Sequence, residues 1–149
     1  MNSAIFSFLH FVAVFGIVGT LVAEWAMLSE TPTYREARLM QACDRWYGFF
    51  AVAILIVGFL RVFYFEKGSA YYFASPFFRA KIGLFVVIGL LSIYPTVRFI
   101  KWRAQMGNGQ APLVPAAEFR ALRAVLRLEL VLLLGMVLCA ALMARGIGV

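Results

Sequence analysis

Four long apolar segments fill most of the 149-residue sequence and limit the folds that it can adopt. Each segment approaches the roughly 20 residues that an α-helix needs to cross the hydrocarbon core of a bilayer. Hydrophobic residues make up 64% of the chain and charged residues 14%, which leaves too little polar sequence to cover a soluble domain. We therefore predict an all-α integral membrane protein. The uncharged segments are residues 1–23, 46–60, 82–97 and 130–144.

The expected architecture is an antiparallel bundle of four transmembrane helices in a single domain, residues 1–149. Backbone polar groups in lipid must be hydrogen-bonded within each helix, and short loops favour antiparallel neighbours. Residues 1–23 contain no Lys or Arg, so the first segment lacks the basic start of a secretory signal and is counted as a helix. The predicted spans are residues 4–28, 46–65, 77–100 and 124–144.

Basic residues are distributed unequally between the two sides of this bundle. One side, formed by the first and third loops, carries Arg35, Arg38, Arg45, Lys101, Arg103, Arg120 and Arg123. The other side carries Lys67, Arg79 and Arg145. Because cytoplasmic loops retain Lys and Arg, this pattern predicts a bacterial inner-membrane protein with periplasmic N- and C-termini.

The net charge of +7 is assigned to contacts with membrane lipids rather than with nucleic acid. The basic residues lie in short loops beside the spans, and the chain contains no DNA- or RNA-binding motif. Anionic headgroups are the expected partners. Arg120, Arg123 and Arg127 recur at helical spacing, so this stretch is either a solvated face at the membrane surface or a docking face for a protein partner.

Ionisable residues within the spans are the candidates for function, because a charge at membrane depth is costly unless it is paired or used. A first group gathers near the inner boundary and contains as many acids as arginines. This balance predicts structural ion pairs between helices, and a proton path through Glu24 or Glu129 is the functional alternative. The group comprises Glu24, Asp44, Arg45, Arg98, Arg127 and Glu129.

A second group, His10, Arg61 and Lys81, lies about 6 to 9 Å below the outer boundary when ~1.5 Å is counted per residue. Glu66 is the acid near these residues in the sequence, so an anionic ligand is one way to complete the group. The two long side chains can instead snorkel to the headgroups. For His10 the alternatives are a hydrogen-bonded packing residue, a metal or haem ligand, and part of a quinone or proton site.

Several cofactor sites and enzyme motifs are excluded. One histidine per chain cannot build a bis-histidine haem site, although it can supply a single axial ligand. Cys43 and Cys139 fall at opposite ends of their helices, so no thiolate zinc site is expected. The chain has no GxSxG, HExxH or GxxxxGK[ST] motif, so the corresponding soluble-enzyme chemistries are not indicated.

Short motifs along nearly the whole chain resemble an uncharacterised family of small bacterial inner-membrane proteins, domain of unknown function family 2214. The resemblance implies a membrane location and no particular activity. It is carried by residues 44–48 (DRWYG), 58–62 (GFLRV), 66–68 (EKG), 77–81 (FFRAK), 91–96 (LSIYPT) and 102–103 (WR).

The chain also resembles, more faintly, the HemJ-type protoporphyrinogen oxidases. These are four-helix membrane proteins with a histidine in the first helix and a lysine early in the third. His10 and Lys81 stand at the matching places. The resemblance implies haem b as a cofactor, with His10 as its ligand.

Three classes of function are compatible with these patterns. The first is a protein of unassigned activity, a scaffold or accessory subunit that engages lipid or a membrane protein partner. The second is a redox protein that holds haem b or a quinone at His10, Lys81 and Arg61. The third is a small transporter, which would need to form a homo-oligomer because four short helices enclose little volume. Whether the chain is an enzyme does not follow from the residues.

Overall fold

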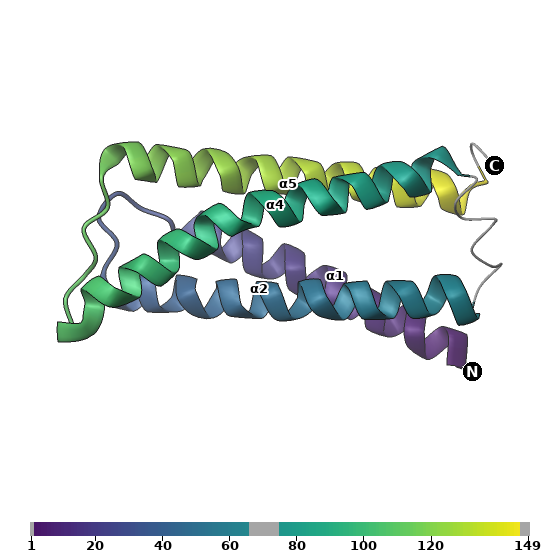
Figure 1. The fold of residues 1–149 in the computed structure, drawn as a ribbon, viewed down its shortest axis with the longest axis horizontal. Helices are drawn as coiled ribbons and strands as arrows, with labels where there is room; N and C mark the ends of the chain where they lie inside the picture. The colour runs from purple at the N-terminus through teal and green to yellow at the C-terminus, as the bar shows by residue number, and fades with distance from the viewer. Residues whose placement is uncertain (1, 66–74, 147–149) are drawn as a thin grey trace.

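The computed structural model describes residues 2–65 and 75–146, which form long helices joined by short connections (Figure 1). Each of the four α-helices contains a segment long and apolar enough to cross a membrane. Two short helical turns follow the second and third of them. The elements are α1 (Asn2–Met27), α2 (Tyr34–Leu60), the π-helical η1 (Arg61–Phe65), α4 (Pro76–Gln105), the 3-10 turn η2 (Met106–Asn108) and α5 (Ala116–Ala144).

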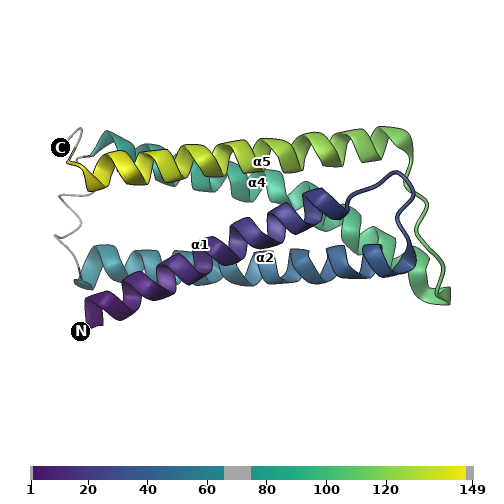
Figure 2. The ribbon, with the colours of Figure 1, turned by 180° about the vertical axis from the view of Figure 1, so that it is seen from behind.

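Successive helices run in opposite directions, so both termini lie at the same end of the molecule (Figures 1 and 2). We call this the terminal end, and we call the opposite end, which carries the α1–α2 and α4–α5 connections, the basic end. The arrangement confirms the predicted all-α fold with an antiparallel four-helix bundle.

Helix α2 begins twelve residues before the predicted span of 46–65, at Tyr34. A capping box explains this start: the Glu36 amide donates to Thr33 Oγ1 (3.2 Å), and the Thr33 amide donates to Glu36 Oε2 (2.8 Å). Arg35, Arg38 and Arg45, which the sequence analysis placed between two helices, therefore lie on α2. The prediction followed hydropathy, and hydropathy marks where a helix enters lipid rather than where it begins.

Helix α5 likewise begins before its predicted span of 124–144, at Ala116, directly after Pro115. Arg123 lies on its second turn, where its guanidinium stacks over the Trp25 ring at 5.2 Å and donates to the Leu28 carbonyl at 3.5 Å. Leu28 follows the last residue of α1. A cation at a helix C-terminus is favourable, so Arg123 fixes the end of α1 against α5.

The bundle consists of two helical hairpins, α1–α2 and α4–α5. The two hairpins approach each other most closely at the basic end (Figures 1 and 2). Within the first hairpin, a Cβ built on Gly16 of α1 would fall 2.4 Å from the Phe50 ring of α2, so only glycine permits this approach. Side chains with almost no exposed surface concentrate near the basic end: Leu21, Met40, Phe99, Trp102, Leu122 and Leu126.

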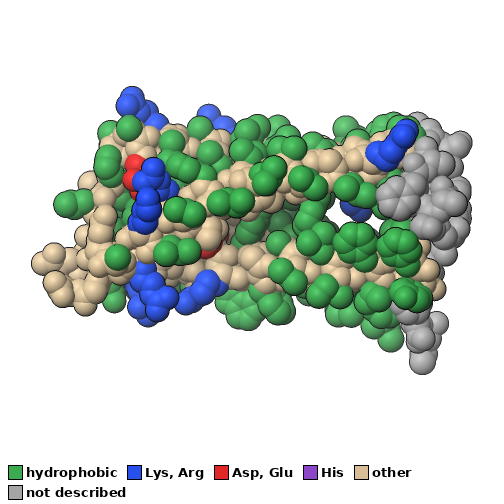
Figure 3. Space-filling view, in the orientation of Figure 1, with side chains coloured by type: hydrophobic (Ala, Val, Ile, Leu, Met, Phe, Trp, Pro, Cys, Tyr) green, Lys and Arg blue, Asp and Glu red, His purple; other side chains and the backbone are tan. Residues whose placement is uncertain are grey.

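The terminal half of the bundle is more open. Figure 3 shows that the face between α2 and α4 is hollowed in this half, with a Lys or Arg side chain visible there. Large apolar side chains cover most of the outer surface around it, as expected for helices that face lipid. The bundle therefore has a packed half and a hollowed half, and each contains one group of ionisable residues.

Candidate functional site

Two buried glutamates occupy the packed half of the bundle. Glu24 of α1 is 2% exposed and Glu129 of α5 is fully buried. Both carboxylate oxygens of Glu129 and Oε1 of Glu24 are buried without a hydrogen-bond partner. Almost all buried polar groups in proteins are hydrogen-bonded, so three such oxygens from two facing helices are unusual. We call these two residues the buried glutamate pair.

Asp44 of α2 completes an acidic layer beside this pair. Its Oδ1 accepts a short hydrogen bond of 2.6 Å from Thr96 Oγ1 on α4. Asp44 lies within electrostatic range of both Glu24 and Glu129, and the buried Tyr47 interacts with all three carboxyl groups. The acidic layer, defined as Glu24, Asp44 and Glu129, thus draws one carboxyl group from each of three helices.

The predicted ion pairs within this layer do not form among the described residues. Arg98 instead forms a salt bridge of 3.4 Å with Glu118. Glu118 was not among the predicted site residues. Arg45 and Arg127 are exposed. Residues one or two positions apart on a helix do not face each other, so Arg45 does not pair with Asp44, and Arg127 does not pair with Glu129. The acids face the interior, and the arginines beside them face outward.

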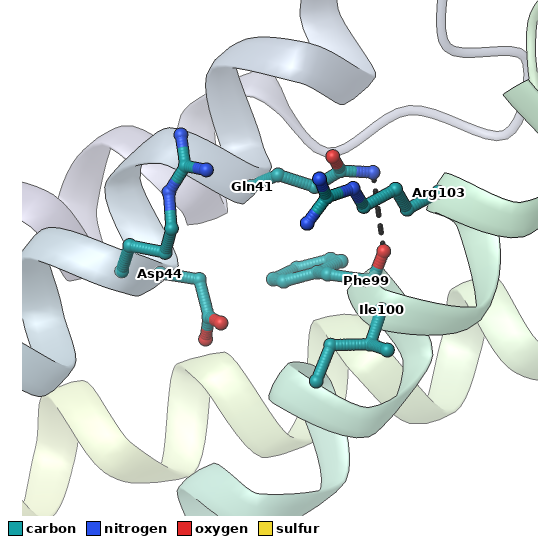
Figure 4. A pocket seen from close by; sticks show the side chains of 6 residues that line it. Gln41, Asp44, Phe99, Ile100 and Arg103 are labelled. Atoms are coloured by element: carbon teal, nitrogen blue, oxygen red, sulfur yellow. Dashed lines mark hydrogen bonds between the residues drawn. The ribbon is translucent and has the colours of Figure 1, made fainter. Parts of the chain in front are cut away.

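A small pocket leads from the surface of the basic end to Asp44. It has a volume of about 60 Å³ and is lined by Gln41, Asp44, Arg45, Phe99, Ile100 and Arg103. Figure 4 shows the Asp44 carboxylate directed into the space between α2 and α4, with Arg103 reaching across from α4. A polar cavity needs at least about 10 to 15 Å³ to hold one water, so the pocket is large enough for water to reach Asp44. Asp44 is therefore the member of the acidic layer with access to solvent.

The arrangement suits the binding of protons or small cations. Carboxyl groups bind both, and water reaches one of the three. No group of three His, Cys, Asp or Glu side chains within residues 2–65 and 75–146 has the geometry of a metal site. Proton transfer between carboxyl groups is chemistry that these residue types can perform.

The second group of predicted site residues lies in the hollowed half. His10 Cε1 lies 4.0 Å from a Cβ built on Gly58, so the ring packs against the backbone of α2 one turn before Arg61. Its Nδ1 is buried without a hydrogen-bond partner. Lys81 and Arg61 are both within electrostatic range of the ring, and each has further interactions of its own. The structure thus brings the three residues together, whereas Glu66 lies outside the described residues.

The fit of haem b to this group is poor. A haem at His10 needs a flat cavity beside one ring nitrogen, whereas the ring already packs against α2. The chain holds no second histidine, and the other two side chains are cations, which suit propionates or other anions rather than iron. Metal ligation by His10 stays a prediction.

Three interacting residues were missed by the sequence analysis. Thr96 follows Pro95 within α4, and its contact with Asp44 depends on how α4 passes α2. Glu118 accepts a 2.9 Å hydrogen bond from Trp102 Nε1 and also contacts Arg98. Gln41 donates to the Phe99 carbonyl at 3.1 Å. Their sequence positions could have indicated them, because all three polar residues lie at about the depth of the inner group of ionisable residues.

The fold and the two ionisable groups define a polytopic membrane protein with four spanning helices. Residues 2–148 match the family described as predicted membrane protein (DUF2214), and the chain belongs to that family. No curated protein and no solved structure matches the chain. The similarity to HemJ-type oxidases is accordingly not shown.

Proposed function

We propose that the protein lies in the cytoplasmic membrane of a bacterium, with its basic end in the cytoplasm and both termini in the periplasm. The proposal is supported by the positions of the basic residues, which concentrate near the connections at one end. Anionic headgroups are the proposed neighbours of these residues.

Single-cysteine labelling in intact cells tests this orientation. Cys43 and Cys139 are first replaced by Ala. An impermeant maleimide should then label Ser69→Cys and should label Asn108→Cys only after the cells are opened. The reverse pattern would contradict the orientation, and labelling of both sites in intact cells would contradict the predicted spans.

We further propose that the acidic layer binds and relays protons, so that the chain acts as a small proton-translocating element. The observation that carries this proposal is Glu129, fully buried with both carboxylate oxygens unpartnered. An ionised side chain that is buried within a span without a partner is costly. A bound proton neutralises the carboxylate and removes this cost. A carboxyl group that binds and releases a proton at this depth can pass protons along a route through the membrane.

The proposed path begins at the pocket of the basic end, where water reaches Asp44. A proton taken up there passes to the buried glutamate pair, with Tyr47 bordering the transfer. On α1, Glu24 and His10 are 14 residues apart, close to four turns, so they share a face of the helix. The path therefore continues through the hollowed half toward His10. Assembly into a homo-oligomer is part of this proposal, because one bundle encloses little volume.

Proteoliposomes with an internal pH-sensitive dye test the relay. A potassium diffusion potential should drive proton flux that falls at least roughly tenfold in Glu129→Gln and in Glu24→Gln. Gln has the shape of Glu and cannot carry the proton. Glu30→Gln, the same change at an exposed position, should keep the wild-type flux. Wild-type flux equal to that of empty liposomes, or unchanged flux in both buried variants, would contradict the relay.

A second candidate is a ligand site at His10, Arg61 and Lys81. It is favoured by the buried, unpartnered His10 Nδ1 and by the two cations within electrostatic range. A π-helical turn begins at Arg61, and such turns occur frequently at functional sites. A quinone carbonyl, which accepts hydrogen bonds, fits this donor set.

Quinone in organic extracts of protein purified from membranes tests the second candidate. It should be recovered in proportion to wild-type protein and lost in His10→Leu. Equal recovery from both proteins would contradict the site. The interpretation as a scaffold or accessory subunit stays a prediction and would gain support if both the flux and the quinone tests fail.

A further inference from the structure

A second pocket lies at the basic end, between the start of α2 and the end of α4. It has a volume of about 200 Å³ and opens beside the pocket that leads to Asp44, with which it shares Gln41 and Arg103. This is room for several waters or for one phosphate group with its oxygens. The lining residues are Tyr34, Arg38, Gln41, Arg103, Met106 and Gly107.

Two arginines from different helices line this pocket. Arg38 comes from the second turn of α2 and Arg103 from the last turn of α4, and both are exposed. Within the described part of the chain, neither makes an ion pair. The nearby acids are engaged elsewhere: Glu36 with Thr33, Glu118 with Arg98, and Asp44 with Thr96.

The floor of the pocket is held by Gln41. Its Nε2 donates to the Phe99 carbonyl of α4 at 3.1 Å and contacts Met106 Sδ of η2 at 3.5 Å, so one side chain ties α2 both to α4 and to the turn that follows it. Figure 4 shows the Arg103 side chain running beside Gln41 toward α2. The helices that carry the two arginines are thus fixed relative to each other before any ligand arrives, which lowers the entropic cost of binding.

We infer that this pocket binds a phosphate-bearing anion between Arg38 and Arg103. A guanidinium group forms paired, charge-assisted hydrogen bonds with phosphate, and two of them from separate helices enclose one group. The start of α2 adds the positive end of a helix dipole. A lipid headgroup and free phosphate share this chemistry. The site does not depend on the proposed proton relay, since it uses none of the acidic layer.

Binding to the full-length protein in a neutral detergent tests the pocket. Calorimetric titration with dioctanoyl phosphatidic acid should give saturable binding that Arg38→Gln/Arg103→Gln weakens about tenfold or more, since each change removes a hydrogen-bonded charge. The control, Arg35→Gln/Lys101→Gln, removes the same charge from the same two helices outside the pocket and should change the dissociation constant less than about twofold. All four positions are exposed, so each variant should retain the wild-type melting temperature.

A parallel titration with inorganic phosphate distinguishes the sources. Binding of the lipid alone, lost in the Arg38/Arg103 variant, assigns the pocket to a headgroup. Equal binding of both, lost in the same variant, assigns it to free phosphate. No binding of either, or equal weakening by the two double variants, would overturn the pocket and indicate only diffuse attraction by the basic end. None of these outcomes changes the expected proton flux of the Glu24 and Glu129 variants.

Discussion

The two halves of the bundle treat their ionisable residues in opposite ways. In the packed half, Glu24 and Glu129 are enclosed with carboxylate oxygens that have no partner, while the arginines nearest to them in sequence face outward. In the hollowed half, His10 lies within electrostatic range of Arg61 and Lys81, and none of the three is fully buried. The first arrangement is compatible with the proposed transfer of protons between carboxyl groups. The second is compatible with the proposed binding of a ligand by His10, Arg61 and Lys81. The difference shows that helix packing, and not the presence of an ionisable residue within a span, decides whether its side chain is enclosed or left partly exposed.

The largest effect that we predict sharpens this comparison directly. Glu129→Leu should raise the free energy of unfolding in detergent by about 1 to 4 kcal/mol, because leucine replaces a buried carboxyl group whose two oxygens lack hydrogen-bond partners. His10→Leu in the hollowed half should give a smaller gain, because the ring is less completely buried than Glu129 and leaves only its Nδ1 buried without a partner. Thermal or denaturant unfolding of the purified variants measures both.

Destabilisation by Glu129→Leu would break the comparison. It would mean that the Glu129 carboxyl group has hydrogen-bond partners in the membrane and stabilises the packed half. The proton relay would then lose the observation on which it rests.

Gly16→Val gives the next effect, and it concerns the level between the two groups. The added atoms meet the Phe50 ring at 2.4 Å, so α1 and α2 must separate or the ring must move. Overpacking of this kind costs about 1 to 3 kcal/mol. Gly19→Val is the matched control, since nothing lies within 4 Å of a Cβ built there and its stability should stay within about 0.5 kcal/mol of wild type. Equal losses in both variants would attribute the effect to valine in a helix rather than to the α1–α2 contact.

The helices and their order could be predicted from sequence because lipid imposes one strong constraint, long apolar segments with internally satisfied backbones. The grouping of His10, Arg61 and Lys81 also followed from counting depth along three helices. The partners of Asp44 and Glu129 did not follow, because depth leaves the rotation of each helix about its axis undetermined. Arg45 and Arg127 lie at the depth of the acids but do not pair with them. Thr96 has no charge that would mark it in the sequence, yet it donates a hydrogen bond of 2.6 Å to Asp44.

Thr96→Val tests that bond and the solvent-accessible edge of the packed half. Valine keeps the shape of the side chain and removes the hydroxyl that donates to Asp44 Oδ1. A hydrogen bond to a carboxylate contributes about 1.5 kcal/mol at the lower end of its range, and we expect a loss of that size because Asp44 is only half-buried. Thr20→Val makes the same change where the hydroxyl donates within one helix, to the Gly16 carbonyl of α1, and should cost less. If the two variants lose the same stability, Asp44 does not depend on Thr96 for its position.

The smallest effect belongs to the ion pair that replaced the predicted ones. Arg98→Gln should lower the free energy of unfolding by less than about 1 kcal/mol, because the Arg98 side chain is 33% exposed and water and salt screen its 3.4 Å contact with Glu118. The remaining bond from Trp102 Nε1 still holds the Glu118 carboxylate at 2.9 Å, so α4 and α5 stay joined at this point. The difference between variant and wild type should shrink further in 1 M NaCl, where the Debye length falls to about 3 Å. A loss of several kcal/mol that salt does not change would show that this pair is shielded from solvent. The basic end would then contain a buried ion pair in which each charge has a partner, in contrast to Glu24 and Glu129.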